Sequence, residues 1–245
     1  MHVFEQIGPL EECLKSCRED GLSIALVPTM GGLHKGHLKL IEKAKECSDV
    51  VMVSVFVNPT QFSENEDFEA YPKTLSVDKT LLEAAKVDAM FLPLDNEIYP
   101  DGSSNDYDVG EMGKILCGIS RPIHFNGVAQ VVARLFDIVK PDYAVFGEKD
   151  YQQLLIIKSL VERQDITTTV VSVPTAREPD GLATSTRNSY LRPEDRAKAP
   201  LFYQQLVDTK AAIQSGADIS SATEQAADAL SAVFDVEYVE ALNAN

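Results

Sequence analysis

The stretch VPTMGGLHKGHLKL, Val27–Leu40, decides the fold that the sequence predicts for the rest of the chain. The apolar run Ile24–Val27 leads into it, and the glycine pair Gly31–Gly32 follows. Behind the glycines lie His34 and His37, and then a pattern of apolar residues at helical spacing. Strand, glycine turn, histidine pair and helix together indicate a nucleotide phosphate site. Glycines let a backbone approach a ligand closely, and amide groups at a helix start favour an anion.

The H-x-G-H pattern of His34 and His37 leaves other interpretations open. It is neither the dinucleotide fingerprint nor a P-loop. The two histidines could share a helix face and bind a metal ion, although no third Cys, His or carboxylate ligand lies close by in sequence. They could also be ordinary surface histidines. Only the rest of the chain can decide among these interpretations.

Composition limits the partners that the chain can have. Its 245 residues make one large domain, or a domain plus a smaller one. The formal net charge is -16 and the pI is ≈ 4.6, which argues against nucleic acid or an anionic membrane as partner. An acidic protein that binds an anionic substrate has to concentrate its positive groups locally. The few Arg, Lys and His residues inside motifs are therefore informative.

The cysteines and the N-terminus predict a cytoplasmic protein. None of the cysteines forms a C-x-x-C pair, so we expect reduced thiols. They are Cys13, Cys17, Cys47 and Cys117. The N-terminal sequence MHVFEQIGPLEE lacks the basic start and apolar run of a signal peptide, and no stretch reaches transmembrane length.

Strand and helix patterns alternate up to Val173. The predicted strands are 23–28, 50–57, 89–94, 143–146 and 167–173, and the predicted helices are 9–18, 38–47, 75–86, 127–139 and 151–163. Such alternation predicts βαβ units and a parallel sheet. The acidic segment 63–72 is expected to be a solvated loop, and 95–110 a long mobile connection.

The alternation of strand and helix patterns ends near Thr175, where we place a domain boundary. A polar loop, 174–190, is followed by helical patterns at 193–215 and 219–234 and by a predicted short strand at 236–241. In parallel sheets ligands bind at the carboxyl ends of the strands. Polar residues follow several predicted strands, so we expect one composite site. These residues are His34, His37, Gln61, Lys149, Asp150 and Arg187.

Four strings of residues together resemble one enzyme family. They are PTMGGLHKGH, FVNPTQF, RPIHFNGVAQVV with PDYAVFGEKDYQQL, and REPDGLATSTRNSYL. In this order, from Val27 to Leu191, they closely resemble the pantothenate synthetase family, the pantoate–β-alanine ligases of coenzyme A biosynthesis. Any one string is a weak signal, whereas all of them together are highly specific.

The resemblance implies a reaction and an architecture. The family belongs to the nucleotidylyltransferases with the H-x-G-H signature and joins pantoate to β-alanine with ATP and Mg²⁺. Pantoate's carboxylate attacks the α-phosphorus of ATP, and the β-alanine amine then attacks the pantoyl adenylate. The implied fold is α/β, with a Rossmann-like ATP- and pantoate-binding domain, 1–174, with helices on both faces of its sheet. A smaller C-terminal α+β lid domain, 175–245, completes it, and the implied assembly is a homodimer.

The resemblance also assigns site residues. His37 matches the family's proton donor, with His34 as its partner; Gln61 and Gln153 match residues that bind pantoate and β-alanine. Asp150 suits magnesium, and as an alternative it caps the following helix. His124 is either structural or a ligand contact, and Gln152 is expected on the exposed side of its helix. The residues implied to bind ATP are Met30, Gly31, Gly32, Leu33, His34, Lys35, Gly36, His37, Gly147, Glu148, Lys149, Asp150, Ala176, Thr184, Ser185, Thr186 and Arg187.

The chain departs from the family's pattern in a few places. The family usually reads M-S-S-R-N where this chain has TSTRN, Thr184–Asn188, so hydroxyl groups are kept at the phosphate clamp. Ile123 replaces a usual glycine, and Gln130 replaces a common threonine. Relatives continue past the EYVEALN string with further strands, so we expect an incomplete lid domain.

Other functions on this fold are disfavoured by particular features. A transferase that stops at the nucleotidyl product would not share Gln61, Gln153 and the RPIHFNGV string. An aminoacyl-tRNA synthetase would need a basic tRNA-binding surface, which the acidic chain does not provide. A non-catalytic nucleotide sensor would be expected to have lost some of the histidines, Lys149 or Arg187.

Overall fold

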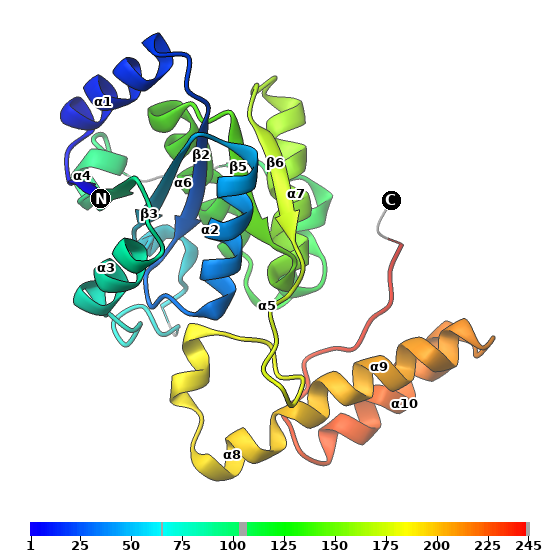
Figure 1. Ribbon diagram of the computed structural model, residues 1–245. Helices are drawn as coiled ribbons and strands as arrows, with labels where there is room; N and C mark the ends of the chain where they lie inside the picture. The colour runs from blue at the N-terminus through cyan, green and yellow to red at the C-terminus, as the bar shows by residue number, and fades with distance from the viewer. Residues whose placement is uncertain (65, 103–106, 244–245) are drawn as a thin grey trace. The chain divides into compact units, whose positions relative to one another are not determined.

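The computed structural model describes residues 1–64, 66–102 and 107–243. The chain divides into two compact units, Met1–Ala176 and Arg177–Asn245 (Figure 1).

The first unit is built on a six-stranded parallel sheet in the order β1-β4-β3-β2-β5-β6. The strands are β1 (His2–Phe4), β2 (Ile24–Thr29), β3 (Val50–Val55), β4 (Ala89–Phe91), β5 (Tyr143–Gly147) and β6 (Thr169–Val173). The predicted α/β fold with a parallel sheet is confirmed. Edge strand β1 was not predicted, because three residues are too few to show a pattern. The strand order reverses between β2 and β5, the place where open parallel sheets bind ligands.

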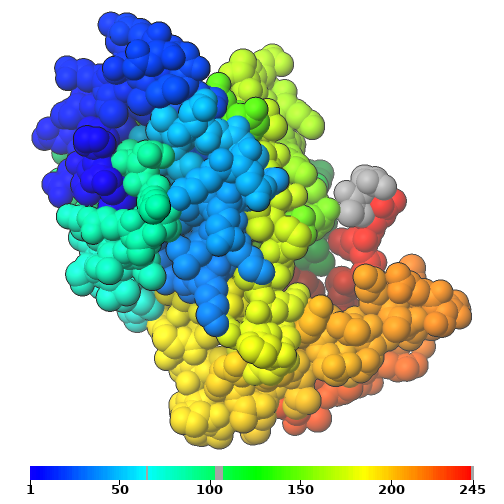
Figure 2. Space-filling view, in the orientation of Figure 1, coloured from blue at the N-terminus to red at the C-terminus, as the bar shows by residue number. Residues whose placement is uncertain are grey.

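Helices cover both faces of this sheet, as the continuous apolar strands require. Ile24 and Leu26 of β2 pack with α1 (Ile7–Glu19), α6 (His124–Val139) and α7 (Tyr151–Arg163). Their neighbours Ala25 and Val27 face α2 (Lys35–Cys47) and α3 (Leu75–Ala84). Figure 2 shows α2, in light blue, covering the second of these faces. Strand β2 is thus buried on both sides, which fixes the position of the glycine turn that follows it.

Several predicted boundaries are wrong by a few residues. Helix α2 begins at Lys35 rather than at residue 38, and α6 begins at His124 rather than at 127. The first turns of both helices contain polar or glycine residues, so the apolar periodicity that predicts a helix begins only after them. Strands β3 and β4 end at Val55 and Phe91, earlier than predicted, because the apolar residues that follow them leave the sheet.

The connections are more ordered than the sequence suggests. Short helices form at η1 (Pro59–Gln61), α4 (Asp95–Ile98), η2 (Glu111–Lys114) and α5 (Cys117–Ser120). Helix α4 lies within the predicted mobile connection 95–110, and η2 directly follows it. Residues 103–106 of this connection lie outside the described part of the chain. The acidic segment 63–72 is not simply solvated, since Glu66 accepts two 2.7 Å hydrogen bonds from Arg121.

The second unit consists of helices and one isolated bridge between Arg177 and Ala183. Its helices are η4 (Thr186–Tyr190), α8 (Pro193–Lys198), α9 (Pro200–Gln214) and α10 (Ile219–Ser231). The helical pattern predicted at 193–215 forms two helices, α8 and α9, because Pro200 lacks an N–H and starts a new helix. The predicted strand 236–241 is wrong: these residues have no regular structure, and a strand needs a paired neighbour to form. Among all residues that the structure describes, no helix is long and apolar enough to span a membrane.

Candidate active site

The glycine turn after β2 has its own backbone donors satisfied within the protein. Gly31 and Gly32 have φ values of 82° and 60°, which glycine adopts without strain. The Gly31 N–H donates to Thr29 Oγ1 at 3.2 Å. The N–H groups of Gly32 and Leu33 donate to the two carboxylate oxygens of Asp78, at 3.0 and 2.8 Å. In the structure, the amides of Gly32 and Leu33 therefore bind an internal carboxylate, and the assignment of these two residues to the ATP site stays a prediction.

The two histidines form the start of α2. His34 is the N-cap, and its Nδ1 accepts from the Gly36 N–H at 3.0 Å. The His34 N–H in turn donates to Nδ1 of His37 at 3.2 Å. The ring centroids lie 4.1 Å apart. Because both Nδ1 atoms accept backbone hydrogen bonds, the neutral rings carry their protons on Nε2. Both Nδ1 atoms are thereby occupied, which disfavours the metal-site interpretation for these atoms.

His37 is neutral in the protein at physiological pH. Burial, together with the nearby His34 and Lys149, lowers the pKa of His37 from 6.5 to about 3. Lys149 contributes to this shift because its positive charge disfavours a second positive charge on the ring. A protonated, positively charged histidine can bind phosphate, but His37 is not in this form at rest. What His37 offers a ligand is a neutral Nε2–H donor.

Lys149 and Asp150 lie between β5 and α7. They form an ion pair with a separation of 3.1 Å, and both side chains are partly exposed to solvent. Asp150 occupies the N-cap position of α7, but its side chain makes no capping hydrogen bond. Asp150 was expected either to bind magnesium or to cap the helix with its side chain. The structure shows no capping hydrogen bond from this side chain, and the carboxylate pairs with the Lys149 ammonium group instead.

Gln61 is held by the turn after β3. It is buried, and its Oε1 accepts from the Asn58 amide at 3.2 Å while its Nε2 lies 3.1 Å from the Met30 sulfur. The oxygen of Asn58 accepts from Tyr99 at 2.7 Å and from Thr60. This arrangement uses the acceptor of Gln61 internally. The amide N–H groups of Gln61 are therefore the atoms directed toward the β2 turn.

The start of α6 supports the same turn. His124 is buried, and its Nδ1 lies 3.0 Å from the carbonyl oxygen of Gln61. Burial lowers the pKa of His124, so the ring is neutral and Nδ1–H donates to that carbonyl. Asn126 donates to the Tyr107 carbonyl, at 2.6 Å. Arg121, as described above, binds Glu66. Of the two interpretations of His124, these contacts favour the structural one.

One of the two glutamines at the start of α7 differs from expectation. Gln152 was expected to be exposed, but it is half-buried and donates to the carbonyl oxygens of Met112 and Ile115, at 2.7 and 2.8 Å. The short helix η2, which the sequence did not predict, supplies the first of these partners. Gln153 is half-buried as well. Gln130, at the position that departs from the family, has a buried Oε1 with no hydrogen-bond partner among the described residues.

The predicted clamp residues lie in the second unit. Thr184 is buried, and the Ser185 hydroxyl accepts from the Arg187 N–H at 3.3 Å, which caps η4. Arg187 itself is exposed. Their part in a composite site with the first unit stays a prediction. Ala176, which is buried, closes the first unit after β6.

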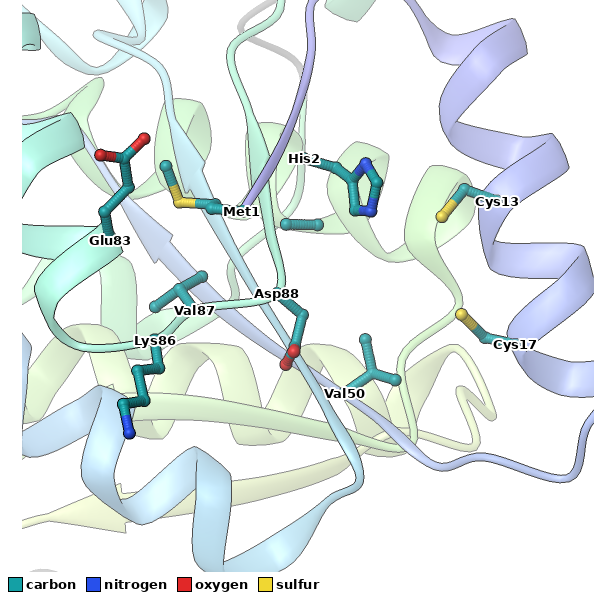
Figure 3. A pocket seen from close by; sticks show the side chains of 10 residues that line it. Met1, His2, Cys13, Cys17, Val50, Glu83, Lys86, Val87 and Asp88 are labelled. Carbon is teal, nitrogen blue, oxygen red and sulfur yellow. The ribbon is translucent and has the colours of Figure 1, made fainter.

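Two cavities lie at opposite ends of the sheet. A cavity of ≈ 730 Å³ adjoins the glycine turn at the carboxyl ends of β3 and β4, and Met30, Gly31 and Asp78 are among its lining residues. A second cavity of ≈ 560 Å³ lies at the amino ends of β1, β3 and β4 (Figure 3). There the thiols of Cys13 and Cys17 point inward from α1. All four cysteines keep their thiols, as predicted. Only the first cavity adjoins the residues that the sequence singled out.

Sequence reasoning missed two residues that hold the site together. Asn58 lies within the quoted FVNPTQF string, and an Asn before a proline was an available signal for a side chain that caps a turn. Asp78 gives no such signal, because it lies inside a helix, 45 residues beyond Leu33 in sequence. Only the tertiary structure brings its carboxylate under the glycine turn.

Comparison with known proteins identifies a single family. The family model described as pantoate-beta-alanine ligase matches residues 2–245. The pantothenate synthetase of Carboxydothermus hydrogenoformans is 51% identical over 207 residues, which are 84% of this chain and 73% of that protein.

Solved structures agree with this match. The crystal structure of pantothenate synthetase from Thermus thermophilus has a TM-score of 0.88 and 44% identity, covering 95% of this chain and 83% of that one. A structure of pantoate-beta-alanine ligase from Francisella tularensis, complexed with beta-gamma ATP and beta-alanine, has a TM-score of 0.89 and 38% identity. It covers 99% of this chain and 90% of that one.

Proposed function

The chain belongs to the pantoate–β-alanine ligase family, and on that premise we propose how its residues join pantoate to β-alanine at the expense of ATP. The observation that supports the residue assignment is the histidine pair at the start of α2, in which both Nδ1 atoms accept backbone N–H groups, so that the neutral rings carry their protons on Nε2. The reaction releases AMP and pyrophosphate and makes pantothenate.

The first step is transfer of an adenylyl group to pantoate. One carboxylate oxygen of pantoate forms a bond to the α-phosphorus of ATP, and the bond from that phosphorus to the bridging oxygen of pyrophosphate breaks. Negative charge grows on the departing pyrophosphate. We assign stabilisation of that charge to the Nε2–H groups of His34 and His37 and to the ammonium group of Lys149. Since His37 is neutral at rest, it acts by donating a hydrogen bond to the pyrophosphate rather than as a stored proton.

The second step makes the amide. The amine of β-alanine attacks the carbonyl carbon of pantoyl adenylate, and AMP leaves with the bonding electron pair. The amine loses a proton in this step. Thr184, Ser185, Thr186 and Arg187 are proposed to clamp the phosphates from the second unit, where a guanidinium group suits a phosphate.

Pantoate recognition is assigned to Gln61 and Gln153. The Oε1 of Gln61 already accepts from Asn58, so Gln61 serves as a donor, and it suits a hydroxyl or carboxylate oxygen of pantoate. Gln153 lies half-buried in the first turn of α7. Neutral amides are appropriate here, because the carboxylate of pantoate has to remain a nucleophile.

A magnesium ion fits the donor set at Asp150. Mg²⁺ commonly binds one or two protein carboxylates together with substrate phosphates, and Asp150 offers a partly exposed carboxylate beside Lys149. When bound there, the ion would neutralise charge on the phosphates of ATP. Asp150 would hold it, and Lys149 would remain free to turn toward the phosphates.

Isotope exchange tests the proposed reaction. Labelled pyrophosphate should enter ATP when pantoate is present and β-alanine is absent, because the first step is reversible and needs no amine. The control omits pantoate and should show no exchange. If AMP forms only with both substrates and no exchange is seen, the adenylate route is wrong.

Replacing Gln153 should separate pantoate binding from ATP binding. For Gln153→Ala we expect the KM for pantoate to rise about 10-fold, the loss of about one hydrogen bond to a charged group, with the KM for ATP nearly unchanged. Steady-state kinetics with each substrate varied in turn measures this. Gln164→Ala, on the exposed end of the same helix, is the matched control and should leave both constants unchanged. Equal increases in both KM values would contradict the assignment.

Location and assembly remain predictions from the resemblance. We propose a cytoplasmic homodimer, because members of the family that the sequence resembles are commonly dimers and the free cysteines suit a reducing compartment. Sedimentation analysis of the purified protein would measure the mass of the assembly.

A further inference from the structure

A buried carboxylate that has no role in the proposed reaction binds the backbone of the glycine turn. Asp78 is 1% exposed and lies in the first turn of α3. Its Oδ2 accepts from the Gly32 N–H at 3.0 Å, and its Oδ1 accepts from the Leu33 N–H at 2.8 Å and the Thr74 hydroxyl at 3.1 Å. A buried carboxylate is costly unless hydrogen bonds compensate it, so these contacts explain why an acid is tolerated at this point.

Asp78 fills an anion site that the turn creates. Two successive residues at positive φ direct neighbouring backbone N–H groups to one point, and such concavities bind phosphates in many proteins. Here the occupant is the protein's own carboxylate. A Cβ atom on Gly31 would lie 3.1 Å from Asp78 Oδ2 and 3.2 Å from Val55 Cγ1, so glycine is needed where the turn passes over the acid.

The hydrogen bonds of Asp78 also affect the position of the two histidines, because the turn and α2 are joined directly by the backbone. Leu33, whose N–H is held by Asp78, directly precedes the N-cap residue His34. The direction in which the chain enters α2 determines whether His34 Nδ1 and His37 Nδ1 can accept their backbone hydrogen bonds. Those bonds in turn place the protons on both Nε2 atoms. If the turn relaxed, the Gly32 and Leu33 amides would become available to phosphate while the histidine rings lost their fixed orientation.

We propose that Asp78 is a positioning residue that closes the amides of the glycine turn to phosphate and thereby leaves stabilisation of the pyrophosphate to the histidine rings. This rests on the proposed function, since it concerns the adenylyl-transfer step. The proposal predicts that a substitution of Asp78 affects the rate of the step and the binding of ATP differently. Loss of Asp78 should lower the rate of the step, while ATP binding is kept or becomes tighter, because a negative charge is removed and two amide donors are released.

Two substitutions at Asp78 test this. In Asp78→Ala, we expect kcat for pantoate-dependent pyrophosphate exchange to fall about 100-fold, the cost of misplacing catalytic groups by about an ångström, with an ATP KM no higher than that of the original protein. Asp78→Asn keeps the volume and one acceptor oxygen, so it should fold and show a smaller loss. The matched control is Asp88→Asn, because the Asp88 carboxylate also accepts a backbone N–H, from Val51 at 2.8 Å, but lies at the second cavity (Figure 3).

A second measurement needs no activity. Nitrogen-15 spectra of the histidine rings should show the Nε2–H form for His34 and His37 in the original protein and in Asp88→Asn, and a mixture of both tautomers in Asp78→Asn. Original tautomers together with original exchange rates in folded Asp78→Asn would overturn the proposal, and so would a rise in the ATP KM with kcat unchanged. Absence of exchange in the unsubstituted protein would refute the proposed function, and the tautomers would still decide the role of Asp78.

Discussion

Replacing His37 by asparagine should lower kcat for pantoate-dependent pyrophosphate exchange about 10²- to 10³-fold, the usual cost of one lost donor to a developing anion. The asparagine oxygen can take the place of Nδ1 and accept the His34 N–H, which His37 now accepts at 3.2 Å. No group of asparagine reaches the position of Nε2. The substitution therefore removes the donor to pyrophosphate and keeps the hydrogen bond that starts α2.

His37→Gln is the complementary control. Its terminal amide reaches the position of Nε2 but does not supply an acceptor at Nδ1, so the rate should fall less than in His37→Asn. The free energy of unfolding should fall by about 1 kcal/mol, as for a lost helix cap. Exchange kinetics at saturating ATP and urea denaturation measure the two effects. A rate in His37→Asn equal to or above the rate in His37→Gln would contradict the role of His37 Nε2–H as a donor.

The pH dependence of stability gives a further check on His37. The folded pKa, about 3, lies below the unfolded value near 6.5. Below about pH 6.5 the unfolded chain therefore binds a proton that the folded protein does not bind. The free energy of unfolding contributed by this residue decreases as pH falls from about 6.5 toward about 3. His37→Asn should lose stability less steeply in that range, and parallel curves would contradict a neutral His37.

The sequence was sufficient for the fold where several signals agree. Strand β2 is apolar on both faces and is followed by glycines, so its place in the centre of a parallel sheet could be predicted from local pattern. Short elements could not be predicted in this way. Strand β1 has three residues and forms through pairing with β4, and the predicted strand 236–241 finds no partner in the described part of the chain.

The residues proposed to contact substrate could be predicted, whereas the residues that hold them in place could not. His34, His37 and Gln61 stand in recognisable strings. Their orientations depend on Asp78, which bonds to Gly32 far away in sequence, and on Asn58, which bonds locally to Gln61 and also to the distant Gly127. The protonation state of His37 could not be predicted from sequence either, because it depends on burial and on Lys149, which is more than 100 residues away in sequence. Residue types therefore predict which chemistry is present, whereas its state depends on packing.

Replacing Gly127 by alanine should disrupt the wall that holds Gln61. Helix α6 passes so close to η1 that a Cβ atom on Gly127 would lie 2.3 Å from the Thr60 carbonyl oxygen and 2.6 Å from the Gln61 nitrogen. The neighbours are backbone atoms, which cannot rotate away. The Gly127 carbonyl also accepts from Asn58 at 3.1 Å, so a displaced helix would lose that bond too. We expect a loss of about 3 kcal/mol in the free energy of unfolding, the upper end for overpacking in a core.

The expected effect on function follows from which backbone moves. Helix α6 carries a large buried face, whereas η1 is three residues long, so η1 should yield and carry Gln61 away from Met30. The KM for pantoate should then rise more than the KM for ATP, whose residues lie after β2 and β5. Gly8→Ala, in α1, is the control, since nothing lies within 4 Å of its Cβ position and alanine favours a helix. Stability equal to that of Gly8→Ala, with an unchanged pantoate KM, would show that the close approach of α6 does not position the glutamine.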